Sequence, residues 1–177
     1  MESALIPSCN YTQQLYLEAG VRSDRLHVIY YGPDADKFDP ARTQPVGLRQ
    51  QYHLSDNAPL IGMVSYFYPP LPAGQWTPPI LHNRANKRHE DLIAAAPLIL
   101  KEYPEARILF IGSGWGEAGE QHRQRLIAQV TESGLAEHLL FIGFRADVNN
   151  LLVDLDVAVQ ASVSENLGGT IESLLME

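Results

Sequence analysis

The sequence SVSENLGGTIE, which ends at Glu172, holds the residue types best suited to bind a phosphorylated sugar. It follows an apolar run that predicts a strand, and ligands of α/β proteins bind beyond the carboxyl ends of such strands. Gly168 and Gly169 allow close backbone approach at an expected helix start, whose free amides can hold a phosphate. The carboxylates of Glu165 and Glu172 can accept hydrogen bonds from vicinal sugar hydroxyls. The alternative is an ordinary helix start that Thr170 or Glu165 caps.

A basic cluster lies at the start of another expected helix. Arg84, Lys87 and Arg88 fall close together in a chain that is acidic overall. A helix start offers free N–H groups and a partial positive charge, so added cations there can seat a diphosphate. The alternative is a solvated basic turn whose charge is balanced by Glu90 and Asp91. These residues alone leave both interpretations open.

A glycine-rich turn gives a different candidate. Gly114, Gly116 and Gly119 satisfy G-x-G-x-x-G, the dinucleotide-binding spacing, after a predicted strand. Trp115 is bulky for a phosphate turn, and the glutamates that follow it would repel a pyrophosphate. Arg145, after the next predicted strand, suits the 2′-phosphate of NADP. An NAD(P)-binding oxidoreductase domain is therefore the second interpretation of the chain.

Four short apolar runs predict the strands that position these segments. Their near-continuous apolar character is typical of strands buried on both faces, as in a parallel sheet. Helical patterns follow over residues 87–103, 118–133 and 147–155, and Gly134 stands where it would cap the second. This alternation predicts an α/β fold with a doubly wound, Rossmann-like parallel sheet. The four runs are Leu60–Phe67, Arg107–Gly112, Leu139–Phe144 and Asp156–Ala161.

Local signals add detail to these elements. Pro97 lies inside the first helical pattern and predicts a kink or a late helix start. Asn10 and Gln13 resemble a capping box that opens a helix running to Gly20. The sequence LHVIYY at 26–31 predicts a β segment in a connector that feeds the main sheet.

The segment between Tyr68 and Asn86 is unusually rich in proline. A long loop inside a compact domain is often a lid or a binding loop, which predicts a lid or an interdomain contact here. Its Pro69-Pro70-Leu71-Pro72 also fits a PxxP ligand. A plain spacer and a non-catalytic interaction module recruited through this loop remain the other interpretations.

Charge and composition exclude several classes of protein. The chain has 13 Lys and Arg against 21 Asp and Glu, a net charge of −8, which disfavours nucleic acid as a partner. Its one cysteine, Cys9, cannot close an intrachain disulfide, and no apolar run is long enough for a membrane span. The six histidines lack paired ligand spacing, so we expect no metal site. We expect a cytoplasmic protein.

Several segments together resemble the group 1 glycosyltransferases of glycosyltransferase family 4, and the likeness covers most of the chain. Lys87 is similar to the lysine of the R…K pair that grips the nucleotide diphosphate in that family. SVSENLG at 162–168 matches its S-x-x-E-x-x-G segment, although the spacing from Glu165 to Glu172 is one residue shorter than is usual. Further similarities are HVIYYGPD at 27–34 with Phe38 and Pro40, and FIG at 141–143 with Leu151, Leu152, Asp156 and Val157.

The resemblance implies the donor-binding, C-terminal half of a GT-B enzyme. It implies transfer of a glycosyl unit from a nucleotide sugar to a glycan, lipid or small-molecule acceptor, with retention and without a metal or other cofactor. Glu165 would contact the donor sugar as the catalytic residue, and Glu172 the nucleotide ribose. The backbone amides of Gly168, Gly169 and Thr170 would lie near the phosphates. The family's arginine is missing after the first strand, and Arg84 is its nearest substitute.

The same resemblance predicts the organisation of the chain. Residues 1–40 would be the end of an N-terminal domain with its linker, and residues 41–177 an incomplete nucleotide-sugar-binding domain. The partner that completes the site would be the missing N-terminal domain, so we expect this fragment to be inactive alone. The full-length enzyme could also sit peripherally at the inner face of the membrane.

Overall fold

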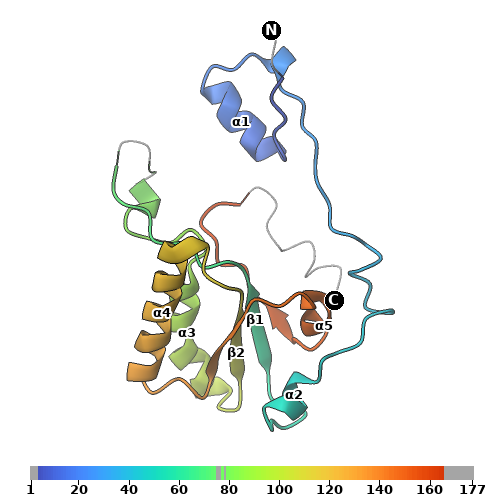
Figure 1. Cartoon of the computed structure of the whole chain (residues 1–177), viewed down its shortest axis with the longest axis vertical. Helices are drawn as coiled ribbons and strands as arrows, with labels where there is room; N and C mark the ends of the chain where they lie inside the picture. The colour runs from blue at the N-terminus through green and yellow to red at the C-terminus, as the bar shows by residue number, and fades with distance from the viewer. Residues whose placement is uncertain (1–3, 75–76, 78, 166–177) are drawn as a thin grey trace.

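Strands form within all four predicted apolar runs, and they make one parallel sheet (Figure 1). The computed structural model describes residues 4–74, 77 and 79–165. Along the sheet the strand order is β3-β2-β1-β4, so the chain crosses over between neighbours as a doubly wound fold requires. The strands are β1 (Leu60–Val64), β2 (Arg107–Ile111), β3 (Leu139–Gly143) and β4 (Val157–Ala158).

Helices cover both faces of this sheet. On one face Met63 and Phe110 pack with Leu92 of α3 and Leu126 of α4 in the larger core cluster. On the other face Leu60, Leu109 and Ile111 pack with residues of α2 and α5, which Figure 1 shows on the side opposite α3 and α4. The helices are α1 (Asn10–Glu18), α2 (Leu48–Gln51), α3 (His89–Glu102), α4 (Gly116–Glu132) and α5 (Val148–Leu152), with short 3₁₀ turns η1 (Ser23–Arg25) and η2 (Pro79–Leu81).

Two helix signals have different outcomes. Gly134 follows α4 with a φ of 72°, the left-handed conformation of a C-terminal glycine, as predicted. Pro97 does not delay α3, because the helix begins at His89 and continues through Pro97 to Glu102. The missing N–H of Pro97 costs that helix one hydrogen bond, and burial of Leu92 and Ile93 against the sheet offsets the loss.

Strand β4 is shorter and less buried than its apolar run predicts. Val157 is 50% exposed, because β4 pairs only with β1 and lies at an edge of the described sheet. Its attachment depends on carboxylates: Asp156 accepts the Leu60 amide at 2.7 Å, and Asp154 accepts the Leu48 amide at 3.1 Å. These aspartates therefore join elements of the fold.

The N-terminal segment differs most from the sequence prediction. The predicted β segment at 26–31 joins no strand of the sheet, because His27 and Ile29 donate to Leu5 and Pro7 at 3.0 and 3.1 Å. Helix α1 begins at Asn10 with Cys9 as its N-cap and no side-chain cap bond, so the predicted capping box is wrong. In Figure 1 this segment stands apart from the sheet, joined to it by an extended chain.

Candidate functional site

Lys87 and Glu165 meet at the carboxyl edge of the sheet although 78 residues separate them in the chain. The Lys87 ammonium forms an ion pair with Glu165 Oε1, and Gln160 Nε2 donates to the same oxygen at 2.8 Å. Their side chains are 15% and 26% exposed, so water screens this pair less than a surface pair. The structure thus brings together two of the residues that the sequence singles out for binding.

Two hydrogen bonds of neighbouring residues hold the two segments side by side. Asn86 Nδ2 donates to the Ser164 carbonyl at 2.9 Å, and the Val163 amide donates to the Asn86 carbonyl at 2.9 Å. Lys87 and Glu165 each lie directly after these paired residues. Their meeting is therefore set by these hydrogen bonds as well as by charge.

The start of α3 is fixed by His89, two residues after Lys87. The imidazole stacks on the Phe67 ring at 3.9 Å between centroids, and its Nε2 lies 3.0 Å from Ser65 Oγ. Burial lowers the pKa of His89 to about 4, so the ring is neutral at physiological pH. A neutral ring can stay in this apolar position without a counter-ion.

Arg88 adopts a conformation that is unusual for a side-chain-bearing residue. Its φ of 57° lies in the left-handed region, and its guanidinium donates to Asp91 Oδ2 at 2.8 Å from Nε. These hydrogen bonds to Asp91 also raise the pKa of Arg88. The guanidinium is therefore engaged with α3, and of the three predicted basic residues it is Lys87 that contacts Glu165.

The other predicted site residues have different positions. Arg84 is exposed, and its backbone carbonyl accepts the Leu71 amide at 3.1 Å; within the described ranges its side chain has no hydrogen bond or ion pair. No hydrogen bond or ion pair within those ranges joins Arg84 to Lys87 or Glu165. The predicted ligands Gly168, Gly169, Thr170 and Glu172 lie outside the residues that the structure describes.

The glycine turn after β2 is used for packing. A Cβ on Gly119 would lie 2.3 Å from the Phe67 carbonyl oxygen, so this glycine lets α4 approach the segment after β1. The Gly114 amide donates to Glu120 Oε2 at 3.1 Å. Hydrogen bonds, first from Arg123, lower the pKa of Glu120 to about 2 and keep it anionic. The Glu120 carboxylate thus already accepts the Gly114 amide, which a dinucleotide phosphate would need. This contact does not favour the NAD(P)-binding interpretation.

Three exposed aromatic residues after β1, β2 and β3 form a wall along the same edge. Tyr66 contacts Trp115 edge-on at 5.1 Å and stacks on Phe144 at 6.5 Å between ring centroids. The sequence reasoning missed this wall. An aromatic residue within a few positions of each strand end is the signal that could have found it.

Two cavities lie along this wall. The edge cavity, of about 160 Å³, is lined by Val64, Ser65, Tyr66, Ile111, Gly112, Phe144, Arg145 and Val148. The loop cavity, of about 520 Å³, is lined by Tyr68, Pro69, Leu71, Leu81, Asn86, Trp115 and Ser164. In the edge cavity, Arg145 is already paired with Asp147 at 2.6 Å, so its charge is partly neutralised.

Two further features of the described residues bear on the site. No group of three or more His, Cys, Asp or Glu side chains there is arranged to hold a metal ion. Within the same ranges, no helix combines the length and the apolar character that crossing a bilayer demands.

Comparison with known proteins finds a family model and a relative that this chain resembles. The sequence model described as "Glycosyl transferases group 1" matches residues 82–171. EpsD of Bacillus subtilis (strain 168), which is described as a glycosyltransferase, is 34% identical over 83 residues, 47% of this chain and 20% of EpsD.

Solved structures match the whole fold. The crystal structure of Anabaena Alr3699/HepE in complex with UDP and glucose is 26% identical with a TM-score of 0.74, over 98% of this chain and 42% of that one. A glycosyltransferase from Rickettsia africae ESF-5 is 25% identical with a TM-score of 0.75, over 99% of this chain and 42% of that one. The chain thus spans a fifth of EpsD and about two fifths of each of these two structures.

The parallel sheet, its helices on both faces and these neighbours define a class, the Rossmann-like domain of GT-B glycosyltransferases. Since the family's sequence model matches half of the chain, the chain belongs to the group 1 glycosyl transferases.

Proposed function

We propose that this chain supplies the donor site of an enzyme that transfers a glycosyl unit from a nucleotide sugar to an acceptor. The observation that carries the proposal is the Lys87–Glu165 pair at the carboxyl edge of the sheet. A half-buried ammonium can compensate the charge of a diphosphate, and an adjacent carboxylate can accept hydrogen bonds from glycosyl hydroxyls. HepE, which has the same fold, was crystallised with UDP and with UDP-glucose, which supports a nucleotide-sugar donor.

The ion pair exchanges partners when the donor binds. Lys87 turns its charge toward the diphosphate, while Glu165, still held by Gln160, meets the glycosyl group. During transfer the bond from the anomeric carbon to the diphosphate oxygen breaks and the acceptor oxygen bonds that carbon. The acceptor proton leaves on the diphosphate. Lys87 stabilises the leaving group, which supports a reaction that needs no metal.

The edge cavity is the proposed seat of the nucleobase. Tyr66 and Phe144 line it, and their rings are nearly parallel, with an interplanar angle of 18°. Flat aromatic faces are suited to stack on a base. We further propose that Arg84 and the amides of Gly168, Gly169 and Thr170 add to the phosphate site, that Glu172 binds the ribose, and that transfer retains the anomeric configuration.

The binding test is a calorimetric titration of the chain with UDP, GDP, UDP-glucose and NADP. We expect saturable binding of a nucleoside diphosphate or its sugar, and Lys87→Ala lowers that affinity about tenfold to a hundredfold. Lys101→Ala is the control, because Lys101 is an exposed lysine in the last turn of α3, the helix that follows Lys87. Saturable binding of NADP alone would overturn the proposal in favour of an oxidoreductase domain.

The activity test uses the full-length enzyme. Glu165→Ala should sharply lower glycosyl transfer, and Glu132→Ala, at the end of α4, should leave it unchanged. The anomeric configuration of the product, read by NMR, tests retention, and the rate in EDTA tests metal independence. Full transfer by the Glu165→Ala enzyme rejects the role given to this carboxylate.

A further inference from the structure

Among the described residues, Arg145 is the only charged side chain that lines the edge cavity. It comes directly after Phe144 of the aromatic wall. Outside that wall, the other side chains of the lining are apolar except that of Ser65. Ser65 Oγ already lies 3.0 Å from His89 Nε2. The Arg145 guanidinium is therefore the strongest polar group that a ligand in this cavity would meet.

Asp147 holds the Arg145 guanidinium in a fixed orientation. Arg145 Nε donates to Asp147 Oδ1 at 2.8 Å, and Nη2 donates to Oδ2 at 2.6 Å, which makes a bidentate pair. These hydrogen bonds raise the pKa of Arg145 and lower that of Asp147, so both groups stay ionised. Within the part of the chain that the structure describes, Nη1 is left unbonded. Asp147 does not line the cavity, so a ligand there meets the guanidinium and not the carboxylate.

A paired guanidinium is suited to a neutral hydrogen-bond acceptor. Arginine offers N–H donors and no acceptor. Because the Asp147 carboxylate compensates its charge, a phosphate gains less attraction from Arg145 than from an unpaired cation. A keto oxygen of a nucleobase needs only the donor, and arginine binds such an oxygen when it pairs with guanine. An exocyclic amino group would instead place its own N–H against the N–H of Arg145.

We infer that Arg145 recognises the base of the nucleotide donor, and that the edge cavity selects a keto base (uracil or guanine) over an amino base (cytosine or adenine). This inference rests on the proposed function, which places the nucleobase in this cavity. Ser65 joins the cavity to the proposed phosphate site, since it lines the cavity and contacts His89, which follows Lys87 closely in the chain. HepE was crystallised with UDP, whose base carries keto oxygens, which supports the inference.

The test is a calorimetric titration of the chain with two pairs of nucleotides, UDP with CDP and GDP with ADP. The members of each pair share the ribose and the diphosphate, and one has a keto base where the other has an amino base. We expect the tightest ligand of the four to be UDP or GDP. We expect it to bind about tenfold more tightly than the amino member of its pair.

Two substitutions of Arg145 separate recognition of the base from a structural role. Lysine offers only donors, so Arg145→Lys should keep the preference for the keto base. Glutamine offers both donors and an acceptor, so Arg145→Gln should bring the ratio of the two affinities close to one. Both substitutions lose the bidentate geometry with Asp147, so a merely structural effect would be the same in the two variants.

Arg22→Gln is the matched control. Arg22 forms the same kind of pair with Asp24, and its Nε donates to Asp24 Oδ1 at 3.0 Å. The N-terminal segment that holds Arg22 stands apart from the sheet (Figure 1). This variant should keep the affinity ratio of the wild type.

The contrary outcomes differ in what they reject. If CDP or ADP is the tightest ligand, or if the two members of its pair bind equally, the cavity does not select a keto base. An equal loss of affinity for both members in Arg145→Gln would assign the guanidinium to the ribose or the phosphates. Loss of the preference in Arg145→Lys as well would leave Arg145 a structural role. Each of these results overturns the inference and leaves the proposed donor function standing. If the wild type binds none of the four nucleotides, the donor function is rejected and the inference fails with it.

Discussion

At the scale of single residues, the candidate site depends on side chains that do not react. His89 stacks on Phe67 and bonds to Ser65, and it fixes the start of the helix that follows Lys87. Arg88 holds a left-handed conformation with the help of Asp91. Both residues position Lys87 through the backbone, and each supports a prediction about stability.

The buried His89 makes stability depend on pH. Its folded pKa of about 4 lies below the ordinary value of 6.5, so between these values the unfolded chain binds the proton more strongly. The contribution of the neutral His89 ring to the free energy of unfolding is fully present above about pH 6.5. This contribution is lost as the pH falls through 4, and the loss is about 3 kcal/mol at most. Urea unfolding between pH 4 and 7 should show this loss in the wild type and much less of it in His89→Gln.

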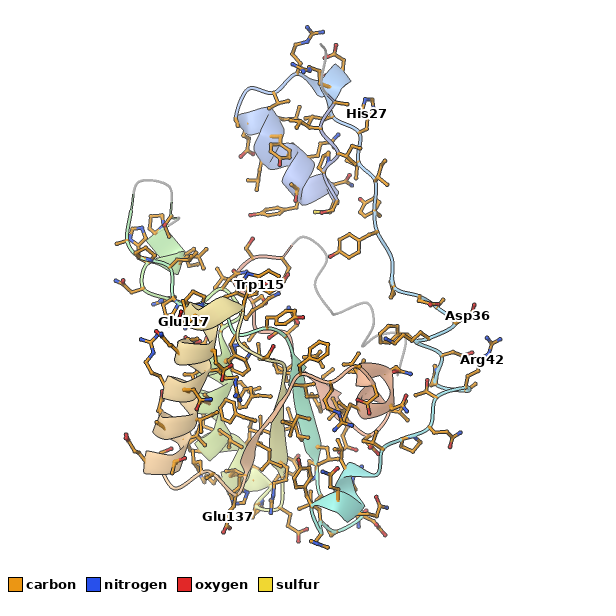
Figure 2. The ribbon with its side chains drawn as sticks, in the orientation of Figure 1. His27, Asp36, Arg42, Trp115, Glu117 and Glu137 are labelled. Atoms are coloured by element: carbon orange, nitrogen blue, oxygen red, sulfur yellow. The ribbon has the colours of Figure 1, made fainter. Side chains whose placement is uncertain are left out.

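His27→Gln serves as the control for this experiment, because His27 is exposed on the N-terminal segment (Figure 2). That variant should keep the wild-type pH dependence. An unchanged slope in His89→Gln would show that the loss at low pH arises elsewhere.

Arg88 allows a test of backbone strain. A left-handed conformation costs a non-glycine residue about 1 kcal/mol, and the Arg88–Asp91 pair returns at most about the same. Arg88→Gly removes both the backbone strain and the ion pair. Its free energy of unfolding should therefore lie within about 1 kcal/mol of that of the wild type. Arg88→Ala keeps the strain and loses the pair, so it should be about 1 kcal/mol less stable. Equal stability of the two variants in urea would contradict the strained conformation.

At the scale of elements, the approach of α4 to the segment after β1 depends on one glycine. A Cβ at position 119 would meet the backbone oxygen of Phe67, which cannot rotate away. Gly119→Ala should therefore destabilise the chain by about 2 kcal/mol, although alanine favours helices. Gly32→Ala is the control, since a Cβ there meets nothing within 4 Å. Thermal unfolding that ranks the two variants equal would argue against this close contact.

The elements also show how far the sequence predicts the structure. Buried strands β1 and β2 could be predicted because their residues are apolar on both faces. The β segment at 26–31 could not be placed, since apolar β-branched residues do not reveal whether the sheet or Leu5–Pro7 will be the partner. The capping box failed for a similar reason: Cys9 takes the cap position one residue earlier.

The position of the candidate site could be predicted from the sequence only in part. Lys87 and Glu165 each have a local sequence signal, and parallel strands bring their segments to one edge. The aromatic wall has no local signal of comparable strength, because Tyr66, Trp115 and Phe144 come from three separate loops. Their contacts exist only once the sheet order is known.

At the scale of the whole molecule, two regions of unequal packing share the chain. Helix α1 has no buried residue within it, whereas Phe38 packs against Leu152 beside the sheet. Between these regions Tyr30 and Tyr31 are exposed, at 57% and 54%. An extended segment without regular pairing fits a protease active site more readily than a folded element does.

We therefore predict that chymotrypsin cuts first after Tyr30 or Tyr31. The products, identified by mass spectrometry, should include a resistant fragment that begins at or near Gly32. Tyr103 is equally exposed but lies in the turn between α3 and β2, where the amides of Tyr103 and Ala106 are hydrogen-bonded. It should be cut later. Early cleavage at Tyr103 would mean that the sheet region opens as easily as the extended segment that holds Tyr30 and Tyr31.

Because the base of the proline-rich loop is closed, the length of that loop can change without altering the geometry of the candidate site. Leu71 and Arg84 are bonded to each other, so residues can be gained or lost between them while Lys87 keeps its place. Doubling the length of such a loop costs only about 0.6 kcal/mol in closure entropy. Selection, or an engineer, can therefore exchange this loop between relatives in one step. The surface beside the Lys87–Glu165 pair would change, and the pair would keep its geometry.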